Sequence, residues 1–244
     1  MKIIDVNMSV GGRDSYGEMI ELDALLVQMR LYRIDHAVCW NEYAMLDPQS
    51  GNARMWELAK HADGKVGVSA VLDPILGEQS LPGSGNLTDR LKALHPESVH
   101  IFPTDNRTIF TAFYWEEILR AVNVLSLPLI VDDDYSPEFF AVLPEIADRY
   151  PDVKFILVRY GLCRGRHVMP LLQKCKNVYF TIENMLDNGQ IEEIRERIGV
   201  DKLLFGTSWP KLSPSGALGL ALYADISEED REKILFRNWE AIRV

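Results

Sequence analysis

The chain alternates along its whole length between short apolar runs and longer amphipathic stretches, and this alternation limits the folds open to it. The apolar runs have the length and the flanking turn residues of buried strands. We expect strands at residues 3–6, 34–40, 66–72, 98–102, 127–131, 153–158, 178–182 and 202–205. The stretches between them have helical periodicity, and we expect helices at residues 21–30, 52–61, 87–94, 115–125, 138–149, 167–174, 191–198 and from 227 to about 239.

Strands that alternate with helices indicate parallel strands joined by helical crossovers. Eight such units in 244 residues close most simply as a (β/α)8 TIM barrel of the α/β class. The pattern alone leaves an open doubly wound sheet as an alternative. Because no Gly-, Ser- or Pro-rich linker divides the chain, we expect one domain over residues 1–244.

The charge balance restricts the kinds of partner. The chain has 26 Lys and Arg against 36 Asp and Glu, a net charge of −10. An acidic surface disfavours nucleic acid and anionic membranes, and no apolar stretch is long enough to span a bilayer. A small anionic substrate or ligand is still compatible, because one local Arg can dominate a pocket. A homo-oligomer is also possible, through the helices outside the barrel.

The cysteines indicate a reducing compartment. Cys39, Cys163 and Cys175 show no CxxC spacing, and we expect free thiols and a cytoplasmic location. The first residues lead straight into a strand rather than into the apolar region of a signal peptide. Arg164 and Arg166 follow Cys163 closely in the sequence. Their charges would lower the pKa of its thiol or attract an anionic ligand to the loop.

Polar and charged residues follow the strands at the end where barrel enzymes hold their chemistry. Asp132, Arg159, Glu183 and Ser208 each come directly after an expected strand. Because the carboxyl ends of the strands of a barrel meet at one rim, we expect these side chains to lie close together.

The sequence at several strand ends resembles that of the amidohydrolase-related (amidohydrolase 2 type) metal-dependent hydrolases. The family's first strand ends in Asp-x-His-x-His, and its eighth reads Phe-Gly-x-Asp-Trp-Pro. Its fifth strand begins with Pro and ends in His, and its sixth follows Pro-x-Val-Lys-Phe-Ile and ends in His before Gly. The matching segments here are Asp5-Val6-Asn7-Met8-Ser9, Pro128 to Asp132, Pro151 to Arg159 and Phe205-Gly206-Thr207-Ser208-Trp209-Pro210. Residues 226–235 with Asn238 resemble the family's last helix.

The resemblance implies a metal site whose ligands have been replaced. At the family's ligand positions and at the nearby histidine of strand six, this chain has Asn7, Ser9, Asp132, Arg159 and Ser208. Only Asp132 is a good ligand for a transition metal, and an Arg cation beside the site would repel a divalent ion. We therefore expect a degenerate site without metal or other cofactor; the alternative is a weakly bound divalent metal such as zinc at a rearranged site.

Arg159 and Asp132 are the most informative pair, and two interpretations are open. Arg159 takes the place of the metal, pairs with Asp132, donates to Asn7 and Ser208, or binds a substrate carboxylate. Alternatively, the pair is a structural salt bridge at the barrel mouth, since a buried charge needs a partner either way.

Three further residues are candidates for the site. His100 lies within the fourth expected strand and is a potential acid or base, although a buried structural histidine is the commoner case. Glu183, after the seventh strand, is a potential acid or base or another partner of Arg159. Trp209 is expected either to contact substrate or simply to pack at the rim.

The family includes hydrolases of amides and esters, lactonases and decarboxylases that act on small carboxylated compounds. The resemblance therefore implies a hydrolase or lyase that works without the usual metal. Arg159 would bind substrate, and Asp132, Glu183 or His100 would transfer protons. The alternative is a catalytically inactive pseudo-enzyme that binds a small anionic ligand or a partner subunit.

Overall fold

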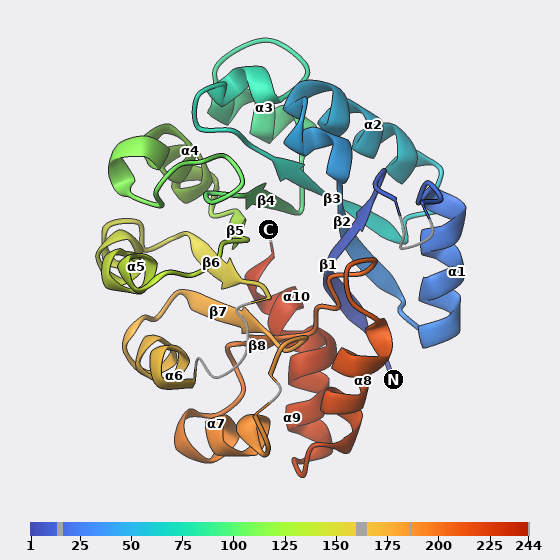
Figure 1. Ribbon diagram of the computed structural model, residues 1–244, viewed down its shortest axis with the longest axis vertical. Helices are drawn as coiled ribbons and strands as arrows, with labels where there is room; N and C mark the ends of the chain where they lie inside the picture. The colour runs from blue at the N-terminus through green and yellow to red at the C-terminus, as the bar shows by residue number, and fades with distance from the viewer. Residues whose placement is uncertain (14–16, 160–164, 186, 244) are drawn as a thin grey trace.

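Eight parallel strands form one sheet in chain order in the computed structural model, which describes residues 1–13, 17–159, 165–185 and 187–243 (Figure 1). Each strand pairs with the next along the chain. The strands are β1 (Ile4–Val10), β2 (His36–Asn41), β3 (Val66–Val71), β4 (Ser98–Ile101), β5 (Pro128–Val131), β6 (Lys154–Leu157), β7 (Val178–Thr181) and β8 (Leu203–Leu204).

Helices connect the strands and surround the sheet (Figure 1). They are α1 (Leu22–Tyr32), α2 (Pro48–Lys60), α3 (Leu87–Leu94), α4 (Ala112–Leu125), α5 (Pro137–Arg149), α6 (Gly165–Lys174), α7 (Gln190–Ile198), α8 (Pro214–Tyr223), α9 (Glu228–Glu232) and α10 (Asn238–Ile242). Short 3-10 turns lie at Glu42–Met45 and Gly77–Ser80, and a π-helical turn at Lys233–Arg237 joins α9 to α10. None of the described helices combines the length and the apolar character that crossing a membrane requires.

The barrel is closed where β1 meets the segment after β8. Val6 N–H donates to Phe205 O at 3.0 Å, and Ser208 N–H donates to Asn7 O at 2.8 Å. Gly206 lies at this junction because β7 is close: a Cβ on it would lie 2.9 Å from Thr181 Cγ2. The (β/α)8 barrel predicted from the alternation is thus confirmed, with a distorted last strand of two residues.

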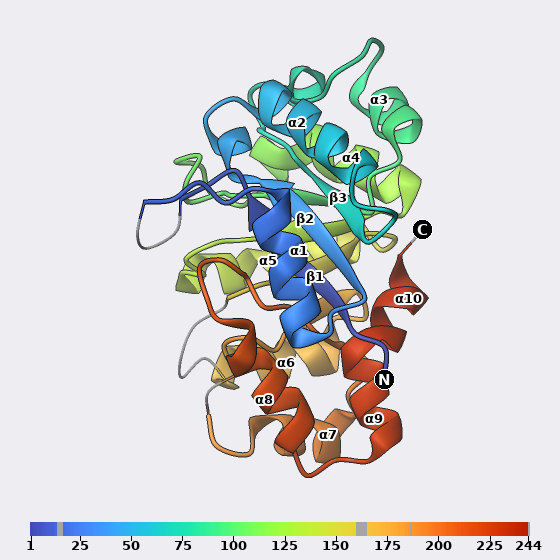
Figure 2. The same ribbon diagram turned by 90° about the vertical axis from the view of Figure 1, so that its right-hand side faces the viewer.

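Side chains fill the inside of the barrel, so it is a packed core. The interior cluster consists of Ile4, Val6, Val38, Ile130, Ile156, Val158, Leu204, Trp239 and Ile242. Its last two members come from α10, which therefore closes the end of the barrel at which the strands begin. In Figure 2, α10 lies on the right-hand side of the view, the side on which the N-terminus also lies.

Local sequence signals set several helix starts. Asp47, Ser136 and Ser213 each accept a backbone N–H of the first helical turn, and a Pro follows each of them as the first helical residue. Ser227 caps the start of α9, because its Oγ accepts the Asp230 N–H at 3.1 Å.

The structure differs from the sequence expectations in details. The helix α8, at Pro214–Tyr223, is not among the helices expected from the sequence. The expected strand at 3–6 continues to Val10, and the expected strand at 202–205 is only Leu203–Leu204. Cys163, with Arg164, lies outside the described residues.

We expect Trp239→Ala to lower the free energy of unfolding by about 3–5 kcal/mol, because Trp239 is buried in the interior cluster at the base of the barrel. Chemical denaturation followed by circular dichroism measures this change. Tyr223→Ala is the control: Tyr223 is 89% exposed, and its loss should change stability by less than about 0.5 kcal/mol. Equal effects of the two substitutions would contradict the packing described here.

Candidate active site

Side chains from five strand ends surround one small cavity at the carboxyl rim of the barrel, which we call the mouth. They come from β1, β2 and the segments that follow β5, β6 and β8. The lining residues are Asn7, Ser9, Trp40, Asp132, Arg159, Ser208, Trp209 and Lys211. All the substrate-binding candidates from the sequence are in this set, together with Asp132, while His100 and Glu183 are not in the lining.

The ion pair between Arg159 and Asp132 occupies the mouth. Arg159 Nε donates to Asp132 Oδ2 at 3.1 Å, and Nη2 donates to Oδ1 at 2.5 Å. This two-point geometry is the one in which guanidinium groups bind carboxylates most strongly. The Asp132 side chain is 5% exposed and that of Arg159 is 29% exposed, so one end of the pair is buried and the other faces the opening.

Burial raises the pKa of Asp132 above its ordinary value, and the charge and hydrogen bonds of Arg159 oppose the rise. Burial also acts to lower the pKa of Arg159, but the attraction of Asp132 outweighs it and the pKa is raised. The guanidinium is therefore charged at any pH at which the protein is folded. Without Arg159, the buried Asp132 carboxyl would have a strong tendency to take up a proton.

A chain of hydrogen bonds joins β1, β8, β7 and β6 beside the ion pair. Asn7 Nδ2 donates to Ser208 Oγ at 2.9 Å, and Ser208 Oγ donates to Glu183 Oε1 at 2.9 Å. The backbone N–H of Arg159 also donates to Glu183 Oε1, at 3.1 Å. The expectation that the Arg159 side chain donates to Asn7 and Ser208 is thus replaced by this direct chain, and Glu183 contacts the backbone of Arg159.

Two members of the mouth have unusual backbone conformations. Arg159 has φ 51° and Ser208 has φ 54°. These values lie in the left-handed region, which few residue types other than Gly, Asn and Asp adopt readily. Such conformations cluster at functional sites, where the surrounding structure holds them in place. Here the hydrogen bonds to Glu183 and Asn7 hold both residues.

His100 lies below the mouth in an aromatic cluster. Its ring stacks on Phe102 with centroids 4.4 Å apart and lies edge-on to Trp40 at 5.2 Å. It is fully buried, neither ring nitrogen has a hydrogen-bond partner among the described residues, and Nε2 lies 3.9 Å from Asp132 Oδ2. Burial lowers its pKa well below the ordinary value, helped by the charges of Lys211 and Arg159, so the imidazole is neutral.

Asp5 stabilises the seam between β1 and β8. Its Oδ1 accepts the backbone N–H groups of Asn7 and Thr207 at 3.0 and 3.1 Å. The side chain is completely buried, and Oδ2 has no partner among the described residues. Burial therefore raises the pKa of Asp5 to about 7, although these hydrogen bonds act in the opposite direction.

Sequence reasoning missed two residues of the site. Lys211 lines the mouth with its ammonium 5.4 Å from the centre of the Trp40 ring, and it forms no ion pair with a described carboxylate. The sequence signal that could have indicated Lys211 is its position two residues after Trp209, which was itself expected at the rim. The hydroxyl of Tyr135 lies 2.5 Å from Val131 O and 2.6 Å from Val158 O, so it braces β5 against β6 just below the ion pair.

The donor set at the mouth does not fit a divalent metal. Among the residues that the structure describes, Asp132 is the only carboxylate in the lining, and both of its oxygens already bind the Arg159 guanidinium. Asn and Ser side chains are weak ligands for transition metals. Over the described parts of the chain, no group of three or more His, Cys, Asp or Glu side chains is placed to hold a metal ion.

The mouth is also small. Its volume is about 10 Å³, which is room for about one water molecule. Known ligand pockets are at least an order of magnitude larger. In the state described here, the Arg159–Asp132 pair fills the space that a ligand would need.

Comparison with known proteins identifies relatives. A family model described as Amidohydrolase matches residues 95–242. A search of curated proteins gives no match. Among solved structures, a 2,6-dihydroxybenzoate decarboxylase complexed with 2,6-dihydroxybenzoate is 14% identical, with 99% of both chains covered and a TM-score of 0.76.

Two other decarboxylases have similar structures. The 5-carboxyvanillate decarboxylase from Sphingomonas paucimobilis is 11% identical, with 99% of this chain and 98% of that chain covered and a TM-score of 0.72. A dihydroxybenzoic acid decarboxylase from a Polaromonas species, with bound manganese and the inhibitor 2-nitroresorcinol, is 17% identical, with 99% and 96% covered and a TM-score of 0.74. At these identities the likeness shows a shared fold.

We expect Arg159→Met to destabilise the protein by about 1–3 kcal/mol, because it leaves Asp132 buried without its counter-charge. Asp132→Asn combined with Arg159→Met removes both charges, so it should cost less than the sum of the two single substitutions. Urea denaturation of the four proteins at pH 7 measures the coupling. Strictly additive effects would show that the pair does not interact in solution.

Asp5 should make stability depend on pH. Its ordinary pKa of 3.8 rises to about 7 on folding, so between these values the folded protein holds a proton that the unfolded chain releases. The contribution of Asp5 is therefore full below pH 4, declines as pH rises to 7 and is constant above it. At 1.36 kcal/mol per pKa unit, the upper bound of the decline is about 4 kcal/mol.

Asp5→Asn tests this dependence, because the amide oxygen keeps the acceptor for Asn7 and Thr207 and cannot ionise. Urea denaturation at pH 4 to 8 should show the wild type losing stability relative to Asp5→Asn as pH rises to 7. Parallel stability curves for the two proteins over this range would refute the raised pKa.

Proposed function

This chain belongs to the amidohydrolase family, and on that premise we propose that it binds a small carboxylated compound through Arg159 and acts on it as a lyase or hydrolase without a divalent metal. The observation that carries the proposal is the two-point bond between Arg159 and Asp132 at the mouth. It is a carboxylate-binding arrangement that the chain's own carboxylate occupies, and a substrate carboxylate of the same geometry can replace Asp132.

The neighbours support the substrate class. Decarboxylases of 2,6-dihydroxybenzoate and 5-carboxyvanillate share the fold over nearly the full chain, and both names denote small aromatic carboxylates. The mouth offers two cations, Arg159 and Lys211, of which Lys211 forms no ion pair with a described carboxylate, and the indole ring of Trp40 beside them. Cations beside an aromatic face suit an aromatic acid better than a neutral amide.

Exchange of carboxylates provides a route to proton transfer. When a substrate carboxylate binds Arg159, Asp132 loses its cation and stays buried, so it takes up a proton. The protonated Asp132 donates that proton to the ring carbon that bears the substrate carboxylate. The bond from this carbon to the carboxylate then breaks, its electron pair returns to the ring and CO2 leaves. Asp132 is again an anion and pairs with Arg159.

His100 and Glu183 support this step from behind the mouth. The neutral His100 ring has its Nε2 near Asp132 Oδ2, which suits it to position Asp132 or to pass a proton to it. Glu183 holds the backbone of Arg159 and the hydroxyl of Ser208. Burial raises the pKa of Glu183, and we assign it a positioning role.

A second candidate function is favoured by the size of the mouth. A volume of about 10 Å³ excludes a benzoate-sized molecule unless the mouth opens. If Arg159 and Asp132 never separate, the protein is a catalytically inactive relative in which the ion pair closes the barrel, and it acts through a partner.

We expect 2,6-dihydroxybenzoate to raise the melting temperature of the wild-type protein and to bind it measurably by calorimetry. Arg159→Ala should weaken binding about 10- to 100-fold, the loss of charge-assisted hydrogen bonds worth about 1.5–3 kcal/mol. Arg197→Ala, which removes an exposed Arg on α7, is the matched control and should bind like the wild type. CO2 release from the same compound tests the reaction, with metal content measured by inductively coupled plasma mass spectrometry on untagged protein.

Each result has a defined meaning. Binding that depends on Arg159, with CO2 release at metal contents far below stoichiometry, supports the lyase. Absence of both binding and turnover with 2,6-dihydroxybenzoate and 5-carboxyvanillate supports the inactive relative with a closed mouth, and binding without turnover would refute the proposed lyase reaction on these acids. Near-stoichiometric zinc or manganese required for turnover would refute the metal-independent site, and binding unchanged in Arg159→Ala would refute the assigned anchor.

A further inference from the structure

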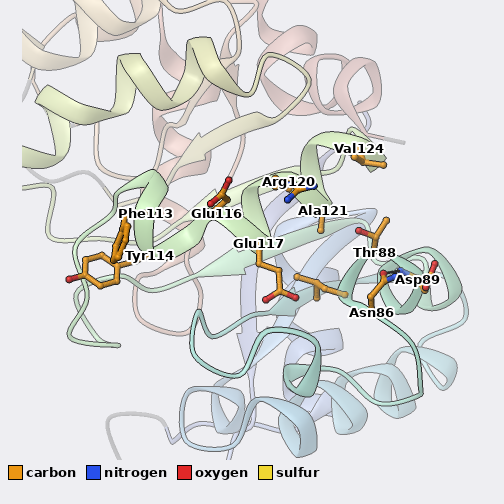
Figure 3. A pocket seen from close by; sticks show the side chains of 11 residues that line it. Asn86, Thr88, Asp89, Phe113, Tyr114, Glu116, Glu117, Arg120, Ala121 and Val124 are labelled. Atoms are coloured by element: carbon orange, nitrogen blue, oxygen red, sulfur yellow. Dashed lines mark hydrogen bonds between the residues drawn. The ribbon is translucent and has the colours of Figure 1, made fainter.

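The outer face of α4 carries an exposed row of side chains with the spacing of a helix-pairing seam. Phe113, Glu117, Arg120 and Val124 are separated by four, three and four residues and are all exposed. Phe113 is 83% exposed and Val124 is 71% exposed. Apolar residues at this spacing on a helix normally face another helix. In Figure 3, Phe113 lies towards one end of this row and Val124 at the other, with Glu117 and Arg120 between them.

A groove runs beside this row, between α4 and the start of α3. Its volume is about 590 Å³, and it is lined on the α3 side by residues 86–89 and on the α4 side by the exposed row, Tyr114 and Glu116. Figure 1 shows α3 and α4 in the helical layer outside the strands. The groove between them shares no lining residue with the mouth. A helix that packs against α4 therefore has room to lie along it without covering Arg159.

The row is complementary to itself when its direction is reversed. Consider two antiparallel copies of α4 related by a two-fold axis that passes between residues 118 and 119. Phe113 of one copy then lies opposite Val124 of the other, and Glu117 lies opposite Arg120. Each apolar residue then contacts an apolar residue, and each charge contacts an opposite charge. The two-fold axis makes every one of these contacts occur twice. A two-fold contact requires this self-complementarity, because the same patch serves both partners.

The charges in the middle of the row have no oppositely charged partner among the described residues. Glu117 and Arg120 are three residues apart on α4, and the side chain of Glu117 instead shares a hydrogen bond with the Glu78 carboxyl. Partial burial raises the pKa of Glu117, and the charge of Glu78 and this hydrogen bond add to the rise. A cation brought by a partner would satisfy Glu117, and Arg120 of a second copy lies at the matching position.

We propose that this face binds a second copy of the same chain, with the two α4 helices antiparallel about a two-fold axis near Ile118 and Leu119. Phe113 and Val124 form the apolar contacts at the two ends, and the Glu117–Arg120 pairs between subunits fix the register. The arrangement leaves the mouths of both barrels open to solvent, and it does not depend on the proposed function.

Charge-reversal variants test the proposal. Sedimentation velocity over a range of protein concentrations measures the association of each variant. The wild type should sediment as a dimer at micromolar concentration. Arg120→Glu places four carboxylates at the seam and should raise the dissociation constant at least 100-fold, and Glu117→Arg should act similarly. The double variant Glu117→Arg with Arg120→Glu restores opposite charges across the seam and should restore the dimer. Arg197→Glu, on α7, where Arg197 pairs with Glu193 of the same helix and neither residue lines the groove, is the control and should leave the dimer intact.

Circular dichroism and thermal melts of each variant separate loss of association from loss of folding. A wild type that sediments at the monomer mass of 27.8 kDa at 100 µM would overturn the proposal. So would a dimer that tolerates Arg120→Glu, or one that the double variant fails to restore, because the contact would then lie elsewhere. Association with another protein in place of a second copy would equally refute it.

Discussion

The ion pair between Arg159 and Asp132 is the interaction on which the mouth of this barrel depends. A carboxylate that is 5% exposed needs a cation, and the guanidinium meets it with two hydrogen bonds. The backbone N–H of Arg159 is held by Glu183, which also binds Ser208. Hydrogen bonds thus join the ends of β1, β6, β7 and β8 at the rim. In the proposed function, the guanidinium that stabilises the rim also binds the substrate carboxylate.

The fold was predictable because its signal is repeated. Eight apolar runs separated by helical stretches leave few arrangements of parallel strands, and the rim of a barrel gathers whatever follows them. The proximity of Asp132, Arg159 and Ser208 followed from this rule and from the resemblance at the strand ends. The proximity of Trp209 and Asn7 to these residues was predictable as well, because β1 closes the barrel against the segment after β8.

The remaining details depend on distances that no pattern contains. Lys211 enters the mouth because the segment after Trp209 turns over Trp40, and only side-chain packing fixes that turn. The bond from Glu183 to the backbone of Arg159 needs a left-handed residue, which neither periodicity nor charge predicts. The small volume of the mouth results from the direction in which Arg159 points. Such features decide between an open and a closed site, so the sequence left both functions open.

Closure of the ring has a consequence for the order in which the molecule is assembled. Asn7 meets Ser208 across a separation of 201 residues, and Trp239 and Ile242 fill the interior from the far end of the sheet. A nascent chain therefore holds its first strand with one edge unpaired until nearly all the others have been synthesised. Ring closure combines the largest loss of chain entropy with the last burial of apolar surface. Until the barrel closes, β1 has an unpaired edge of the kind to which other chains can pair, and closure removes this edge.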